Sequence, residues 1–122
     1  MRQKTKEKTK NEKGLAEQLK LEEGTIEFWV RKGKLQWCDG LIRVLLSLSN
    51  EQGSIFIVKD SDNKLKFFHV FLGKGRTDVE IDVSDLSNSK DHHIAATWSV
   101  SKKETALYID GGERTAKSEI NY

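Results

Sequence analysis

The stretch Thr25–Arg31, TIEFWVR, indicates the fold class, because its side chains alternate between the two faces of an extended strand. One face carries Ile26, Phe28 and Val30, and the other carries Thr25, Glu27 and Trp29. A period of two over such a stretch predicts a β-strand rather than a helix.

The same period continues beyond this stretch, interrupted by turns that contain Gly, Asn, Asp and Ser. Further apolar or alternating segments span residues 41–48, 55–58, 65–72, 78–83, 94–100 and 106–109. The first of these is almost continuously apolar and predicts a central strand. About seven strands with no helical period between them predict an antiparallel sandwich or barrel.

The length and the charge limit the organisation further. A chain of 122 residues has room for one domain. Residues 1–20 begin with a polar, Lys-rich run and are predicted to form a disordered or frayed lead-in, whereas residues 21–122 are predicted to form the folded domain. The net charge is +2, but most of the positive excess lies in the first ten residues. A folded surface without basic excess does not favour a specific nucleic-acid partner.

Cysteine usage and hydropathy add two expectations. Cys38 is the only cysteine, so no disulfide forms within the chain. The basic start is not followed by the apolar stretch of a signal peptide, and no apolar run is long enough for a membrane span. These patterns leave the localisation open.

Four segments, taken in order, resemble one known family. They are residues 24–30 (GTIEFWV), 59–65 (KDSDNKL), 92–98 (HHIAATW) and 107–111 (LYIDG). Together they resemble the laminin-G-like domains of the concanavalin-A-like lectin and glucanase superfamily. The resemblance implies an all-β, two-sheet antiparallel jelly-roll sandwich, and it implies an extracellular or cell-surface context.

The chain departs from the family pattern at two places. Asp91 stands where family members usually carry a tryptophan before the paired histidines. Family members also continue with further strands beyond the position of Tyr122, so the sandwich is expected to be incomplete at its C-terminal end. An incomplete sandwich implies an open sheet edge, which a partner chain or a second copy could pair with.

A carbohydrate site needs an exposed aromatic platform beside polar groups. Trp37, with Gln36 and Asp39 in the same loop, is the candidate from the sequence; the alternative is that Trp37 anchors its loop on the core. Trp29 and Trp98 lie in strands and are expected to pack internally. Adjacent Phe67 and Phe68 must face opposite sides of their strand, so one of the two is expected to meet a second buried surface or a partner.

The turn that contains Asp60, Asp62 and Asn63 is the candidate metal site. These side chains supply oxygen ligands of the kind that Ca²⁺ takes. The favoured alternative is an Asx turn that closes a hairpin without an ion. We therefore expect either no cofactor or Ca²⁺ at this turn.

Catalytic and histidine-based metal sites have weaker support. Glu80, Asp82 and Asp85 resemble the carboxylates of jelly-roll glucanases, but Asp85 is one methylene shorter than the glutamate expected there. His92 and His93 are adjacent strand residues and point to opposite faces, so they do not favour one shared ion. We expect no enzyme activity here.

The resulting hypothesis is a non-catalytic recognition module that binds a glycan or a protein surface through loops at one rim. The alternative is a structural or oligomerising domain without a small ligand. A glycoside hydrolase is the third and least favoured function.

Overall fold

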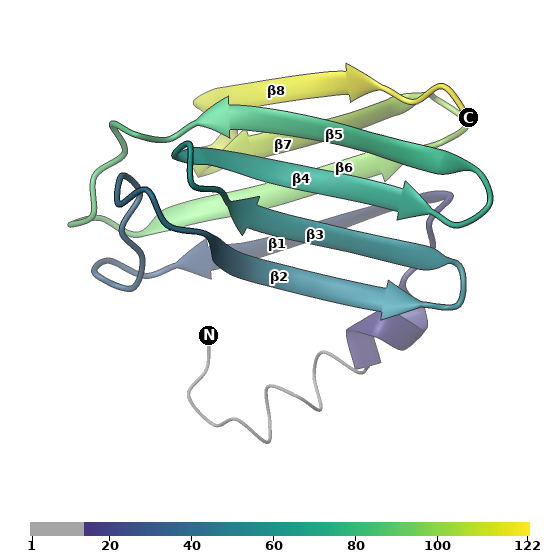
Figure 1. Cartoon of the computed structure of the whole chain (residues 1–122), viewed down its shortest axis with the longest axis horizontal. Helices are drawn as coiled ribbons and strands as arrows, with labels where there is room; N and C mark the ends of the chain where they lie inside the picture. Colours follow the sequence, from purple (N-terminus) through teal and green to yellow (C-terminus); the bar gives the residue numbers. More distant parts are fainter. Residues whose placement is uncertain (1–13) are drawn as a thin grey trace.

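A computed structural model describes residues 14–122 and contains two four-stranded antiparallel sheets that pack face to face (Figure 1). Sheet A has the order β1-β6-β7-β8, and sheet B has the order β2-β3-β4-β5. The strands are β1 (Glu23–Val30), β2 (Arg43–Asn50), β3 (Gly53–Lys59), β4 (Lys64–Phe71), β5 (Gly75–Asp82), β6 (His92–Ser99), β7 (Glu104–Ile109) and β8 (Arg114–Glu119), with the short 3₁₀ helix η1 (Asp110–Gly112) before β8. The predicted all-β sandwich is confirmed.

The strands agree with the sequence prediction except at two places. β8 was not predicted, and β2 is an edge strand rather than the expected central strand. At this edge, Leu41, Ile42 and Val44 keep more than half of their surface exposed. The apolar run therefore supplies both the buried Leu48 and an exposed apolar border.

The core lies between the sheets and is built from the inward positions of both. Sheet B contributes Ile55, Ile57, Leu65 and Phe67, and sheet A contributes Ile94, Ala96, Trp98, Leu107 and Ile109. Most of these side chains have no exposed surface, and burying each large one stabilises the fold by roughly 1.5–3 kcal/mol. Of the adjacent phenylalanines, Phe67 is buried and Phe68 lies on the outer face of sheet B.

The segment before β1 also packs on the sandwich. Residues 14–18 form a helical turn, and Leu19 and Leu21 belong to the core. The Asn50 amide donates hydrogen bonds to the carbonyls of Ala16 (3.1 Å) and Leu19 (2.9 Å). Residues 14–20 of the predicted lead-in therefore pack on the sandwich, and residues 1–13 lie outside the described residues.

The two long sides of the sandwich differ. On one side, β5 and β8 lie next to each other (Figure 1), and Ser118 and Arg114 of β8 donate hydrogen bonds to the carbonyls of Asp78 (2.7 Å) and Asp82 (3.1 Å). On the other side are β1 and β2, with a cleft of about 170 Å³ between the sheets. In the described part of the chain, no helix has the length and apolarity needed to cross a membrane.

Candidate functional site

The structure places the predicted platform, Trp37, in the core. Its side chain is only 1% exposed, its backbone N–H donates to the Asn88 side chain (3.1 Å), and its ring lies edge-on to His92 at 5.6 Å. A buried indole offers no face to a sugar ring. Trp37 therefore serves as the anchor of its loop, the alternative that the sequence left open.

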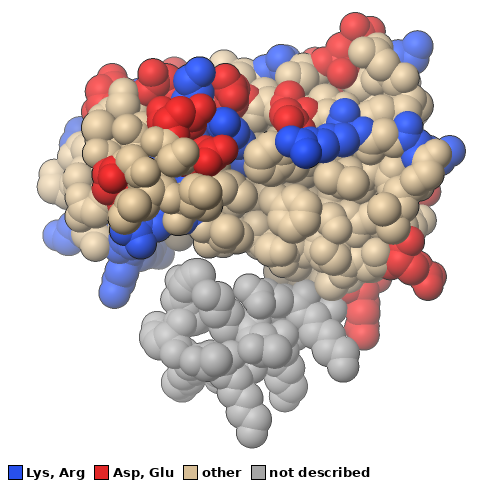
Figure 2. All heavy atoms as spheres, in the orientation of Figure 1, with Lys and Arg blue, Asp and Glu red and all other residues tan. Residues whose placement is uncertain are grey.

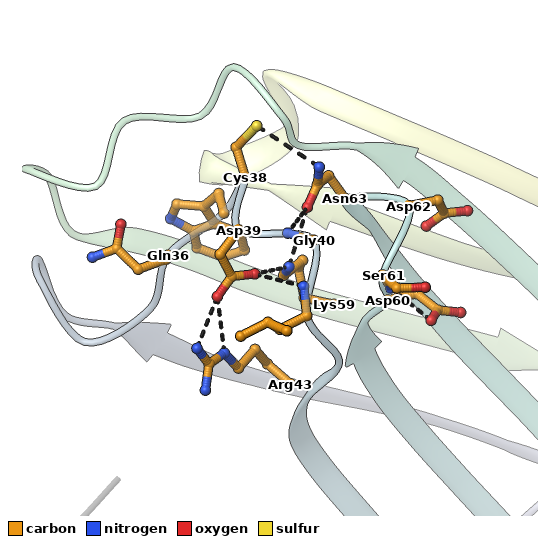
Figure 3. Close-up of polar contacts among 12 residues, drawn as sticks. Gln36, Cys38, Asp39, Gly40, Arg43, Lys59, Asp60, Ser61, Asp62 and Asn63 are labelled. Carbon is orange, nitrogen blue, oxygen red and sulfur yellow. Dashed lines mark hydrogen bonds and ion pairs between the residues drawn. The ribbon is translucent and has the colours of Figure 1, made fainter.

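Asp39 is surrounded by cationic groups of its own chain (Figure 3). Its carboxylate accepts hydrogen bonds from the fully buried Lys59 ammonium, from the Leu41 N–H (3.0 Å) and from the Arg43 guanidinium (2.8 and 3.1 Å). These partners, Lys59 first, hold the pKa of Asp39 well below its usual range. Gln36 is exposed, points away from Asp39, and accepts a hydrogen bond from Asn88 (2.8 Å).

The predicted calcium ligands do not converge. Asn63 turns toward the Trp37 loop and accepts hydrogen bonds from the Gly40 N–H (2.8 Å) and the Lys59 ammonium (3.3 Å), whereas Asp60 and Asp62 point the other way (Figure 3). Both aspartates contact the Lys66 ammonium, at 3.0 and 3.1 Å. A cation at this turn would have to displace Lys66. Across residues 14–122, no group of three or more His, Cys, Asp or Glu side chains could hold a metal ion.

Each of the glucanase-like carboxylates is bound by another group of the chain. Glu80 pairs with Lys64 (3.1 Å), Asp82 accepts hydrogen bonds from Ser84, and Asp85 pairs with Arg114 (2.7 Å). The Ser84 N–H lowers the pKa of Asp82, and the Arg114 hydrogen bond lowers the pKa of Asp85. A general acid needs a raised pKa, so this arrangement does not favour hydrolysis.

The outer face of sheet B carries a group of charged side chains toward one end and a largely uncharged area beside it (Figure 2). On this face Lys64 and Lys66 of β4 form ion pairs with neighbouring carboxylates. On the same face, Phe68 is half-buried and is covered by the Arg76 guanidinium at 4.8 Å from the ring centroid. Arg76 is paired with Asp78 (2.7 Å), and the half-buried Phe68 ring beneath it exposes too little surface to serve as a stacking platform.

The two histidines separate as the strand geometry requires. His92 is buried, with Nδ1 at 2.8 Å from an Asp110 carboxylate oxygen and Nε2 at 2.8 Å from the Ser87 carbonyl oxygen. His93 lies on the outer face of sheet A and contacts the Glu27 carboxylate at 2.8 Å. His92 therefore holds the corner between β6 and η1, and only His93 is available to a ligand.

The exposed aromatic residue beside polar groups is Trp29, which the sequence had suggested as a packing residue. It is 53% exposed on the outer face of sheet A, because β1 turns Ile26, Phe28 and Val30 inward. Trp29 lies opposite His93 in the β1–β6 ladder, with ring centroids 5.0 Å apart. The alternation in residues 25–31 already grouped Trp29 with Thr25 and Glu27, and this signal could have identified the site.

We call Glu27, Trp29, Arg31 and His93 the Trp29 cluster. The Arg31 guanidinium lies 5.5 Å from the Trp29 ring centroid and pairs with Asp91 (3.2 Å). The Lys32 N–H donates to Asp91 (2.8 Å) and, together with Arg31, lowers the pKa of this carboxyl group. The cluster therefore combines an aromatic face with fixed charges of both signs.

The face of sheet A continues from the Trp29 cluster along β1 and β6. Ala95 lies opposite Glu27 on one side and Tyr108 on the other, followed by the pair Thr25 and Thr97. The small side chains lead to an open polar cleft of about 440 Å³, lined by residues that include Thr25, Thr97, Ser99, Lys102 and Glu104. The outer face of sheet A thus joins an aromatic end to a hydroxyl-bearing end.

Two four-stranded antiparallel sheets in this arrangement define the chain as a β-sandwich of the jelly-roll class. Residues 9–120 match the model of a laminin G-like family described as the concanavalin A-like lectin/glucanases superfamily, and the chain belongs to this family. No curated protein and no solved structure matches the chain significantly. The superfamily contains both lectins and glucanases, so membership alone leaves the ligand and the reaction open.

Proposed function

We propose that this domain is a non-catalytic recognition module that binds a carbohydrate through the outer face of sheet A, with Trp29 as the stacking platform. The observation that carries the proposal is the 53% exposure of Trp29 beside Glu27 and His93. A sugar ring has an apolar C–H face, which suits an indole, and hydroxyl groups, which suit a carboxylate and an imidazole.

The remainder of the face supports an oligosaccharide rather than a single sugar. The side chain of Ala95 is small, so a chain of sugars could extend from Trp29 over Ala95 toward the polar cleft at Thr25 and Thr97. Threonine and serine hydroxyls both donate and accept hydrogen bonds, as sugar hydroxyls do. A protein surface is the other candidate ligand, but the hydroxyl-lined cleft favours the carbohydrate.

The absence of catalysis is part of the same proposal. The carboxylates considered for hydrolysis are not on sheet A. Glu80 lies on sheet B and pairs with Lys64, and Asp85 lies in the loop after β5 and pairs with Arg114. Retaining hydrolysis requires two carboxyl groups about 5–5.5 Å apart, one of them with a raised pKa. The contacts of Glu80 and Asp85 support binding without turnover.

The test is a glycan array probed with the full chain and with Trp29→Ala, each in calcium and in chelator. We expect wild-type binding to one sugar class in both conditions, and binding at least about tenfold weaker for Trp29→Ala, which corresponds to about 1.4 kcal/mol. Val44→Ala is the matched control, because it removes an equally exposed apolar side chain from the other sheet. It should bind as the wild type does.

Two outcomes would contradict the proposal. An empty array from protein whose fold is verified by circular dichroism would reject carbohydrate as the ligand. Binding that survives Trp29→Ala unchanged would reject the outer face of sheet A as the site.

A further inference from the structure

The outer edge of β1 differs from the other sheet edges. The β1–β6 ladder is regular along all eight residues of β1, without a bulge, and the chain contains no proline. Among the described residues no strand pairs with the outer edge of β1. A long, regular, unprotected edge is a template for pairing with another strand.

Within residues 14–122, the other three edges carry protection that β1 lacks. β5 and β8 lie against each other, and β8 side chains bind carbonyl oxygens of β5. β2 has a register shift between Val44 and Leu46, and such a bulge disrupts further pairing. β1 is thus the edge best suited to accept a strand.

The side chains of β1 are also incompletely covered. Ile26, Phe28 and Val30 face the core but remain half-buried, whereas their ladder partners Ala96 and Ile94 have no exposed surface. A strand added next to β1 would place further side chains beside these three. The edge therefore offers apolar surface as well as backbone groups.

The backbone groups at this edge can be assigned from the ladder. The Val100 N–H donates to the Glu22 carbonyl (2.8 Å), so these two residues form a hydrogen-bonded pair. Because such pairs alternate along an antiparallel ladder, the N–H and C=O groups of Thr25, Glu27 and Trp29 point away from β6. These are the groups that an added strand would bind.

We infer that the partner strand is β1 of a second copy of this chain, paired antiparallel about a twofold axis at Trp29. In this register Trp29 of each copy faces Trp29 of the other, and Glu27 of each copy lies opposite Arg31 of the other. On the inner face Phe28 lies opposite Val30. Both charged side chains are accessible, with 65% of Glu27 and 63% of Arg31 exposed.

Charge selects this register among the alternatives. Opposite residues in an antiparallel pair point to the same face, so the axis must pass through a residue position for the inner faces to join. An axis at Glu27 would place Glu23 opposite Arg31, but it would also set the two Glu27 carboxylates directly against each other at the centre of the pairing, which is destabilising. Axes at Ile26 or Phe28 place Glu27 opposite Thr25 or Trp29, without an opposite charge. Within residues 23–31, only the axis at Trp29 gives opposite-charge pairs, two between Glu27 and Arg31, without a like-charge pair.

The dimer would join the two copies of sheet A into one continuous sheet and bring the two Trp29 clusters side by side. This pairing uses backbone groups and apolar contacts of β1 and the charges of Glu27 and of Arg31, the residue that follows β1, and it does not depend on a ligand. An empty glycan array would leave it untouched, and a monomeric chain would leave carbohydrate binding untouched.

Sedimentation velocity of the full chain, from low to high micromolar concentration, tests the inference. We expect a reversible monomer–dimer equilibrium for the wild type. Glu27→Arg and Arg31→Glu should each raise the dimer Kd at least about tenfold. Each variant puts two like charges opposite each other at positions 27 and 31, and the twofold axis repeats this contact. The double variant Glu27→Arg/Arg31→Glu should restore the wild-type Kd to within a few-fold, and a mixture of the two single variants should form heterodimers.

The matched control is Arg76→Glu on β5, an exposed charge reversal on the other sheet, which should leave the dimer Kd unchanged. Circular dichroism of each variant verifies the fold. A wild type that stays monomeric throughout the range would overturn the inference. So would a dimer whose Kd does not respond to either single reversal, or single-variant losses that the double variant does not restore.

Discussion

At the scale of single residues, Trp29 is exposed and Trp37 is buried, the reverse of what their sequence contexts favour. Trp37 lies in a loop beside Gln36 and Asp39, and this context favours exposure, yet its ring is only 1% exposed. Trp29 lies in a strand, yet 53% of its surface is exposed. The reason is that exposure depends on the layer that a side chain faces, and neighbours in the sequence do not specify that layer.

The two tryptophans should therefore differ in their contribution to stability. Trp37→Ala removes a fully buried aromatic side chain and should lower the free energy of unfolding by about 3–5 kcal/mol. Trp29→Ala removes an exposed one and should change it by less than about 1 kcal/mol. Urea unfolding followed by circular dichroism measures both. Equal losses in the two variants would contradict the assignment of Trp37 to the core and Trp29 to the surface.

At the scale of elements, strands that bury large apolar side chains were predicted and β8 was not. The inward positions of β8 carry Arg114, Ala116 and Ser118, opposite Ile109, Leu107 and Thr105 of β7. The inner face of β8 carries no large apolar side chain. Two of its inward residues, Arg114 and Ser118, instead donate hydrogen bonds to backbone carbonyls of β5. Edge or central position also could not be predicted for β2, since an apolar run is compatible with either.

The hairpin between β2 and β3 depends on Gly53. This residue has φ 155°, and a Cβ atom there would lie 2.0 Å from the carbonyl oxygen of Val70 in β4. Gly53→Ala should lower the free energy of unfolding by more than about 1 kcal/mol. Gly14→Ala, where an added Cβ meets no atom within 4 Å, is the control and should be close to neutral. Chemical denaturation of both variants measures these effects. An unchanged midpoint for Gly53→Ala would mean that β4 moves aside and would contradict the prediction.

At the scale of the whole molecule, His69 joins three distant segments. Its Nε2–H donates to the Leu21 carbonyl (2.8 Å) before β1, and its Nδ1 accepts from the Tyr122 hydroxyl (2.5 Å) at the last residue. The Tyr122 ring also stacks on the imidazole, with centroids 5.8 Å apart. Burial lowers the pKa of His69, which keeps the ring neutral as this pair of hydrogen bonds requires.

This histidine should make the fold sensitive to mild acid. Its pKa in the folded state lies below the unfolded value of about 6.5, so the unfolded chain takes up the proton first. The contribution of His69 is complete above that pH and is lost as the pH falls toward the folded pKa. Urea unfolding at about pH 7 and about pH 5 should show a smaller drop in stability for His69→Gln than for the wild type. His93→Gln, on the surface, should retain the wild-type drop.

The fold class follows from the amino-acid sequence alone, because alternation with a period of two specifies strands and the turn residues separate them. The sequence also indicates that the Asp60–Asn63 segment closes a hairpin and that His92 and His93 point apart, since both follow from local backbone geometry. The burial of Trp37, the exposure of Trp29 on a sheet face, and the position of β1 as an edge with which no described strand pairs were not predictable from the sequence. These properties depend on strand order and on the packing of the two sheets, which arise from contacts between residues far apart in the chain.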